Sequence, residues 1–239
     1  MKNITALATG ALVVVTVSGV LTACTPTTEQ AYTGTAPATP TVWTGSPAPA
    51  TSAEHGGGYE QPAEGTNLHQ YIVDNKIAEI PFKKGDAGGP TIAFPFPPDW
   101  RSAGDATPDW AYGAIVYNKA SDPTDPPFMY AIGSKLTGNV DPNKILELAP
   151  GQLNELPDFK PVGGPPERTT FDGYDAVSYT GTYMREGKPR AVGQETIVIP
   201  GKDGPFVVQL NGDAPKGQEQ VVRDAVELMR EQTKITVPS

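Results

Sequence analysis

The composition of this chain changes near residue 66, and this change indicates which part of the chain can fold. Between residues 25 and 66, Thr, Pro, Ala, Gly and Ser supply 31 of the 42 positions, and hydrophobic residues follow no regular period. Such a segment cannot bury enough apolar surface to offset the entropy that a chain loses on folding. We therefore predict a disordered tether over residues 24–66 and one globular domain over residues 67–239, whose 173 residues can form a single core.

The segment before the tether has the plan of a secretory signal. Lys2 provides a basic start, an apolar run extends from Ile4 to Val20, and Leu21-Thr22-Ala23-Cys24 matches the bacterial lipobox. We predict a lipoprotein signal peptide over residues 1–23 and acylation of Cys24. Because each buried methylene contributes about 0.8 kcal/mol, two or more acyl chains anchor a protein stably. The alternative is an ordinary signal peptide that happens to precede a cysteine.

The charge and the cysteine count exclude several classes of protein. Residues 1–23 hold one of the 18 lysines and arginines and none of the 27 acids, so the remaining chain has a net charge of −10. We expect no nucleic-acid binding, which needs clustered Lys and Arg. Cys24 is the single cysteine, so no disulfide can form within the chain. The core alone must stabilise the domain.

Hydrophobic periodicity and turn residues predict an α+β domain with an antiparallel β-sheet and helices packed on it. A break or bend is expected in the second helix at Pro150-Gly151. The last helix has the clearest apolar stripe, from Val221 to Met229. The expected helices cover residues 68–75, 142–153 and 218–232, and the expected strands cover 77–82, 91–96, 111–117, 128–136, 168–171, 174–183, 191–199 and 206–211.

Six stretches of the domain form a distinctive set, namely Gly113–Tyr117, Asp122–Pro127, Gly133–Gly138, Asp141–Leu146, Thr196–Pro200 and Phe206–Asn211. Together with the lipobox, the Thr/Pro-rich tether and the first helix, they resemble the LpqN family of actinobacterial lipoproteins. The resemblance implies a Mog1/PsbP-like α/β/α sandwich, with an antiparallel sheet between helical layers. It also implies a role in the mycobacterial cell envelope, in lipid or glycolipid handling alongside exporters of trehalose-linked mycolates. The family supplies no catalytic motif.

Residues suited to catalysis or metal binding are sparse. The two histidines are His55 in the tether and His69 in the first helix, and the Gly-x-Ser-x-Gly motif of many serine hydrolases is missing. Asp122, Asp125 and Asp141 could offer oxygens to calcium, but Asp-Pro turns explain them more simply. We therefore expect no enzyme, no cofactor and no metal site.

Aromatic residues form the one cluster that suggests a ligand. Trp100, Trp110, Tyr112 and Tyr117 lie around a loop that is rich in Gly, Ser and Asp. Such side chains could line a groove for an acyl chain or stack on a sugar ring, since ligand pockets combine apolar walls with a few polar groups. The alternative is that the two tryptophans fill the core at the ends of strands.

Together these features predict a lipid-anchored, non-enzymatic binding protein on the extracytoplasmic face of the plasma membrane. Its expected partners are that membrane, through Cys24, an envelope glycolipid and mycolate-export membrane proteins. One alternative is a protein-protein interaction module of envelope or secreted complexes, including a form released from the cell. A third possibility is an ester hydrolase without a recognisable motif.

Overall fold

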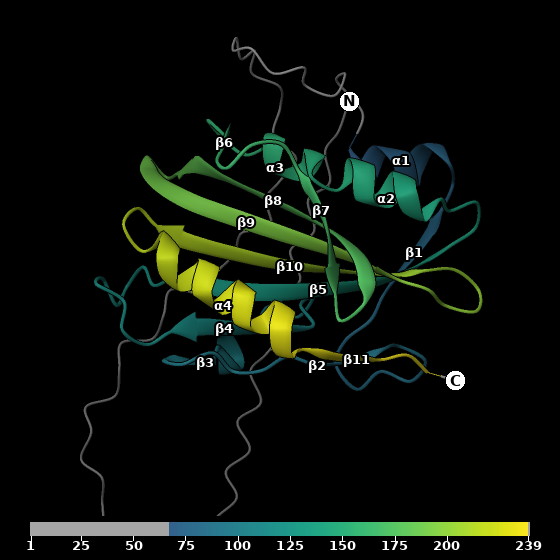
Figure 1. The fold of residues 1–239 in the computed structure, drawn as a ribbon, viewed down its shortest axis with the longest axis horizontal. Coiled ribbons are helices and arrows are strands. Elements are labelled where there is room, and N and C mark those ends of the chain that lie inside the picture. Colours follow the sequence, from purple (N-terminus) through teal and green to yellow (C-terminus); the bar gives the residue numbers. More distant parts are fainter. Residues whose placement is uncertain (1–66, 239) are drawn as a thin grey trace, which may run out of the picture. The chain divides into compact units, whose positions relative to one another are not determined.

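The computed structural model describes residues 67–238. The predicted signal peptide, Cys24 and the tether with His55 lie outside the described residues. One large antiparallel sheet forms the centre of the described domain, with α4 (Glu219–Gln232) on one face and three shorter helices on the other (Figure 1). These three are α1 (Leu68–Asp74), α2 (Pro142–Leu148) and α3 (Gly151–Asn154).

The large sheet has nine strands, and every pair in it is antiparallel. Its main path runs β3-β4-β5-β10-β9-β8-β6, while β1 pairs with β5 and β7 pairs with β8. The strands are β1 (Ala78–Pro81), β3 (Trp100–Ser102), β4 (Gly113–Tyr117), β5 (Phe128–Thr137), β6 (Lys160–Pro161), β7 (Glu167–Phe171), β8 (Tyr174–Arg185), β9 (Lys188–Ile199) and β10 (Phe206–Pro215). A 3-10 turn, η1 (Gly104–Ala106), follows β3.

Alternation along the strands produces two apolar clusters, one on each face of the sheet. Ile197 and Ile199 of β9 belong to the cluster beneath α4, whereas Val198 between them belongs to the cluster beneath α1 and α2. The stripe predicted on α4 is confirmed, because Val222, Ala225 and Met229 are its buried residues. The arrangement confirms the predicted α+β class with a sheet packed between helices.

Most predicted elements are present. Asn67 caps α1, since its side chain accepts a hydrogen bond from the amide of Gln70. The predicted second helix is divided into α2 and α3 at Ala149 and Pro150. A break was expected there, because the ring of a proline clashes with the carbonyl of residue i−4 in a continuous helix.

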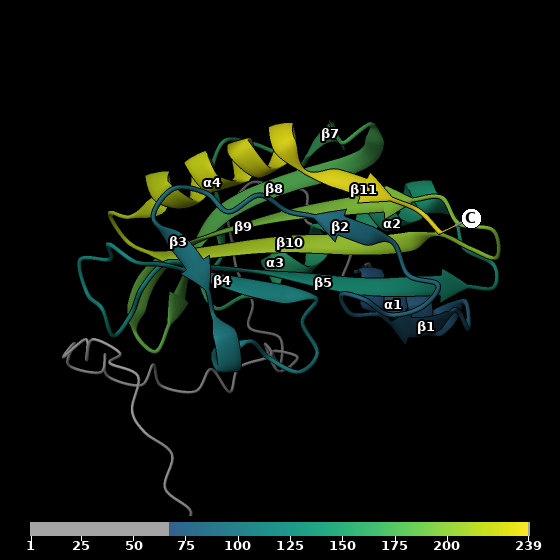
Figure 2. The same ribbon diagram turned by 90° about the horizontal axis from the view of Figure 1, so that it is seen from below.

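Three short strands were not predicted, namely β3, β6 and β11 (Lys234–Thr236). Each has two or three residues, too few to show a period. β11 pairs with β2 (Thr91–Ala93) in a separate two-stranded sheet, so the segment predicted over residues 91–96 does not join the large sheet (Figure 2).

Candidate functional site on the sheet face next to α1

The structure does not bring the four predicted groove residues together. Trp100 and Tyr112 are buried members of the core cluster on the α4 face, and Tyr117 packs against that cluster. The Trp100 and Tyr117 ring centroids lie 5.6 Å apart, as their paired positions in β3 and β4 require. The amide of Ile92 donates to the Tyr112 hydroxyl oxygen at 2.9 Å, so this tyrosine also holds β2.

Trp110 lies on the other face of the sheet. Its side chain is 37% exposed and packs edge-on against Tyr130, with ring centroids 5.4 Å apart. Tyr130 alternates with Met129 and Ala131, which point into the core beneath α4, so Tyr130 and Trp110 share the face that carries α1. Burial raises the pKa of Tyr130 to about 12, so its phenol stays neutral at physiological pH.

A cavity opens on this face between α1 and the sheet. Five elements contribute to its walls, namely α1, α3, β1, β5 and β10. The walls therefore include both apolar and polar side chains. The lining residues are Leu68, His69, Ile72, Glu79, Ile132, Ser134, Leu136, Gln152, Val207 and Gln209. The cavity thus adjoins the apolar cluster beneath α1 and opens toward amide side chains.

Four amide side chains, which we call the polar row, extend from the cavity along the sheet. Gln209 donates to Oε1 of Gln152 in α3 at 2.7 Å, and Gln194 donates to Oδ1 of Asn211 at 3.1 Å. Gln194 also lies 3.4 Å from the same Gln152 oxygen, which connects the two pairs. The row consists of Gln152, Gln194, Gln209 and Asn211. Each amide retains donors or acceptors that a ligand could use.

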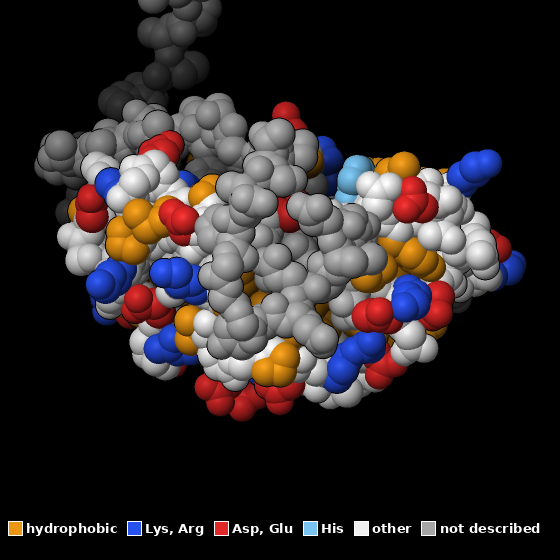
Figure 3. Space-filling view, turned by 90° about the horizontal axis from the view of Figure 1, so that it is seen from above, with side chains coloured by type: hydrophobic (Ala, Val, Ile, Leu, Met, Phe, Trp, Pro, Cys, Tyr) orange, Lys and Arg blue, Asp and Glu red, His pale blue; other side chains and the backbone are white. Residues whose placement is uncertain are grey.

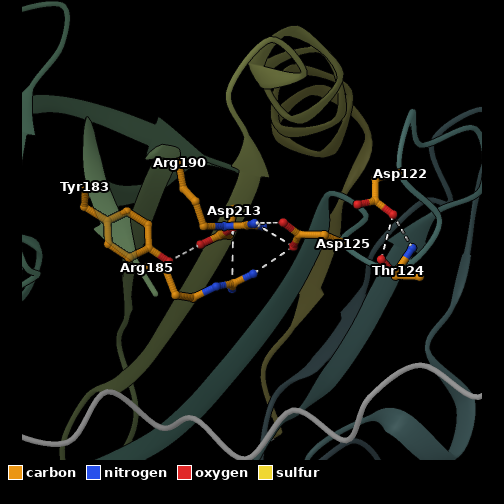
Figure 4. Close-up of polar contacts among 7 residues, drawn as sticks. All are labelled: Asp122, Thr124, Asp125, Tyr183, Arg185, Arg190 and Asp213. Atoms are coloured by element: carbon orange, nitrogen blue, oxygen red, sulfur yellow. Dashed lines mark hydrogen bonds and ion pairs between the residues drawn. The ribbon is translucent and has the colours of Figure 1, made fainter. Parts of the chain in front are cut away.

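A group of four charged residues, the charged ring, lies at the far end of the same face (Figure 4). Arg190 donates through Nε to Asp213 and through Nη1 to the two Asp125 oxygens at 2.6 and 2.8 Å. Arg185 donates to Asp125 Oδ1 at 3.0 Å, and its Nη1 lies 3.8 Å from Asp213 Oδ1. The ring therefore joins the turn before β5, the β8–β9 hairpin and β10.

Burial and ion pairing act in opposite directions on the pKa of Asp213 in the ring. Burial raises the pKa of Asp213, while the guanidinium groups of Arg190 and Arg185 oppose that rise. Tyr183 donates its hydroxyl to Asp213 Oδ2. Burial and the charge of Asp213 raise the pKa of Tyr183 above its usual range, so this phenol remains a neutral donor.

The sequence contained a partial signal for this face. Gln209 and Asn211 alternate with Val208 and Leu210, which indicated that one side of the last strand is more polar. Asp213 continues the alternation, but its partners come from β8 and β9, and the arginines among them also contact Asp125 in a distant turn. Residues from such distant segments could not be connected without the fold.

Three further observations concern the described domain as a whole. Within residues 67–238, no group of three or more His, Cys, Asp or Glu side chains is placed to hold a metal ion. In the same residues, no helix has the length and hydropathy needed to cross a membrane. Seen from the α1 side, acidic and basic side chains are interspersed on the visible surface, with hydrophobic side chains between them (Figure 3).

Comparisons with known proteins find relatives over this domain. A family model described as "Probable lipoprotein LpqN" matches residues 64–236. Lipoprotein LpqN of Mycobacterium tuberculosis (strain ATCC 25618 / H37Rv) is 44% identical over 169 residues, which cover 71% of this chain and 73% of that protein. A crystal structure of LpqN, described as involved in cell envelope biogenesis of Mycobacterium tuberculosis, matches with a TM-score of 0.68 and 43% identity and covers 73% of this chain and 99% of that one.

The resemblance noted in the sequence is thereby confirmed. The family model spans nearly all of the described domain, and the similarity in sequence is accompanied by similarity in fold. The chain belongs to the LpqN family of probable lipoproteins.

Proposed function

We propose that this chain is a lipid-anchored, non-enzymatic protein of the cell envelope that binds an amphipathic lipid or glycolipid during envelope transport or biogenesis. Support comes from its membership of a lipoprotein family and from the LpqN crystal structure, whose protein is described as involved in cell envelope biogenesis. The observation that carries the proposal is the cavity next to α1, which has apolar walls and leads into the polar row.

This arrangement suits a ligand with an apolar and a polar end. Ile72, Ile132 and Val207 offer apolar surface, and burial of a hydrocarbon chain there would contribute about 25 cal/mol per Å². Gln209 and Gln152 at the cavity edge can exchange hydrogen bonds with a polar group. Binding sites commonly combine apolar walls with a few polar groups that orient the ligand.

The predicted anchor places such a site within reach of a membrane. Acyl chains on Cys24 would hold the protein at the extracytoplasmic face of the plasma membrane. A flexible tether over residues 25–66 would span about 35–40 Å. We propose mycolate-export membrane proteins as partners that would deliver or receive a trehalose-linked lipid.

Dodecyl maltoside below its micelle-forming concentration provides a test ligand with one alkyl chain and a neutral disaccharide head. Native mass spectrometry of the full chain carrying Cys24→Ser should detect a one-to-one complex. Ile72 lines the cavity, so Ile72→Gln should weaken binding roughly fivefold, as expected from the loss of about 1 kcal/mol of apolar contact. The matched control is Val73→Gln, because Val73 follows in α1 and is 55% exposed.

The two variants decide between specific and unspecific binding. Equal affinities for Ile72→Gln and Val73→Gln would place the alkyl chain elsewhere and count against the cavity. Absence of a complex with the parent chain would count against lipid binding altogether, and crosslinking in the envelope would then test the protein-interaction alternative.

The hydrolase alternative has one structural observation in its favour. His69, Ser134 and Glu79 line the same cavity, which brings a hydroxyl, an imidazole and a carboxylate to one place. No hydrogen bond connects these three side chains within residues 67–238. A serine-directed fluorophosphonate that labels the protein at Ser134 would support a hydrolase, and an unlabelled protein would favour the binding role.

A further inference from the structure

We propose that residues Trp43–Pro49 of this chain's own tether, which lie outside the described residues, dock across the sheet face that carries α1 and compete there with the ligand. The docking itself does not depend on the proposed function, whereas the competition rests on it. The occupant is an uncharged segment with one tryptophan and two prolines, and it belongs to the same chain as its site.

A band of six side chains crosses four neighbouring strands of the sheet. The strands are β5, β10, β9 and β8, and their register places one side chain of each strand directly opposite the next (Figure 1). Directly opposite residues of antiparallel strands share a face, which here is the face of α1. An aromatic pair ends the band on either side, with ring centroids 5.4 Å apart in one pair and 5.5 Å apart in the other. This cross-sheet band consists, in order, of Trp110, Tyr130, Asn211, Gln194, Tyr179 and Phe159.

The chemistry of the band suits an extended segment that contains proline. Proline-rich segments in the polyproline conformation dock on aromatic side chains in several recognition domains. Their peptide groups form no internal hydrogen bonds, so the side-chain amides of Asn211 and Gln194 can pair with them. Gln194 donates to Oδ1 of Asn211 at 3.1 Å, which holds both amides in place before docking. The band therefore offers aromatic rings at its ends and hydrogen-bonding groups at its centre.

The proposed segment matches the band in length. Three strand spacings separate Tyr130 from Tyr179, which is about 14 Å. In the polyproline conformation, Trp43 would lie about 12 Å from Pro47 and about 19 Å from Pro49. The tryptophan can therefore contact one aromatic pair while the prolines contact the other. The sequence between them is Thr-Gly-Ser, whose small side chains let the backbone approach the amides.

The tether enters the domain beside this band. Asn67 donates to Glu155 at the end of α3, and the neighbouring Asn154 accepts from the Tyr179 hydroxyl at 3.2 Å. Pro49 precedes Asn67 by 18 positions, and a flexible chain of that length spans about 21–25 Å. The segment therefore reaches the Tyr179 end of the band without stretching, at an effective concentration in the millimolar range.

Charge does not oppose the contact. Residues 67–239 hold 23 of the 27 acids and 17 of the 18 lysines and arginines, which gives the domain a net charge of −6. Residues 30–53 contain no Asp, Glu, Lys, Arg or His, whereas acids are present in the tether on both sides of this stretch. Because like charges repel, the uncharged stretch approaches the acidic domain at a lower cost than the acidic parts of the tether do.

A nitroxide label tests the docking without any ligand. The full chain carrying Cys24→Ser has no other cysteine, so Thr41→Cys provides a single labelling position two residues before Trp43. We expect the side-chain NH signals of the cross-sheet band to lose more than half of their NMR intensity through paramagnetic broadening, relative to the reduced label. The signal of Arg223, on the exposed side of α4, should keep its intensity.

Two outcomes would overturn the proposal. Equal broadening on both faces of the sheet, or none on either, would mean that the segment does not dock on the band. Broadening of the band that increases with protein concentration would mean that the segment binds a second copy of the chain.

Substitutions on both sides of the contact identify its anchors. In the labelled chain, Trp43→Ser should reduce the broadening at least threefold, because an aromatic side chain supplies a large contact area. Val42→Ser is the matched control, and equal broadening in the two variants would contradict the assignment. Trp110→Ser should act like Trp43→Ser, with thermal unfolding as the check that it is folded. Phe96→Ser should have no effect, since exposed Phe96 lies between β2 and β3, whose buried residues pack beneath α4.

Dodecyl maltoside separates this inference from the proposed function. The docked segment would cover Asn211 and Gln194 of the polar row, so Trp43→Ser should bind dodecyl maltoside about threefold more tightly than Val42→Ser. Equal affinities would overturn the competition. If the band is broadened but no variant binds dodecyl maltoside, the docking stands and the lipid-binding function fails. If binding depends on Ile72 but the band is not broadened, the docking is wrong and the function stands.

Discussion

Gly133 of β5 is a position where one methyl group decides the packing of the core. A Cβ atom built there would lie 2.5 Å from Cζ of Phe82, and the Phe82 ring is packed edge-on against Tyr112 and Phe206. We expect Gly133→Ala to lower the free energy of unfolding by about 1–3 kcal/mol, because the crowded ring must shift. Urea denaturation measures the change.

Gly113 supplies the control for that substitution. It also lies in a strand, but a Cβ atom there would have no neighbouring atom within 4 Å. Gly113→Ala should therefore change stability by less than about 0.5 kcal/mol. If both variants lost the same free energy of unfolding, the loss at Gly133 would come from replacing a glycine in a strand and not from contact with Phe82.

At the scale of elements, an ion pair between Arg230 of α4 and Glu195 of β9 connects the helix to the sheet. Arg230 donates from Nε and Nη2 to the two oxygens of Glu195 in β9, at 3.1 and 2.8 Å, and Glu195 is buried. Arg230→Met would leave this carboxylate without its cation. We expect the variant to lose about 3 kcal/mol of stability at neutral pH.

The loss should depend on pH in a defined direction. Burial raises the pKa of Glu195 in the folded protein, and the Arg230 guanidinium limits that rise. Without Arg230 the folded-state pKa should rise further above the unfolded value, so the folded variant binds a proton more tightly than the unfolded one. The stability deficit should be full at pH 7.5 and should shrink as pH falls through the folded-state pKa.

Urea denaturation of Arg230→Met at pH 7.5 and pH 5 measures this dependence. Arg223→Met is the control, since Arg223 lies on the exposed side of α4 and donates to Gln220. Its effect should be small and nearly the same at both pH values. A deficit in Arg230→Met that does not change with pH would show that lost packing of the arginine stem, and not the buried charge, is responsible.

For the whole molecule, attachment to the membrane should depend on a single sulfur atom. If Cys24 carries the acyl chains, Cys24→Ser removes that anchor. We expect the parent chain in the membrane fraction and the variant in the soluble fraction of a host that processes lipoproteins. Retention of the variant in the membrane fraction would point to another means of attachment.

Local chemistry made much of the fold predictable. Periodicity predicted a helix from residue 142 and the long strands from β8 to β10, and the proline at 150 predicted the break after α2. The short strands β3, β6 and β11 were missed because they are strands only through pairing with distant segments. The polar row was partly visible in the sequence, but the charged ring was not, because its residues are up to 88 positions apart.

The sequence by itself determined the α+β class, the order of the main elements and the family. The class and the order follow from periodicity and turn residues, which act over a few neighbouring positions. The family follows from stretches whose residues resemble those of LpqN. Only the tertiary structure decided that Trp110 shares a face with Tyr130 while Trp100 and Tyr112 enter the core, and that Arg185 and Arg190 meet Asp125 and Asp213. Strand order and register set these neighbours, and both depend on contacts between segments that are far apart in the chain.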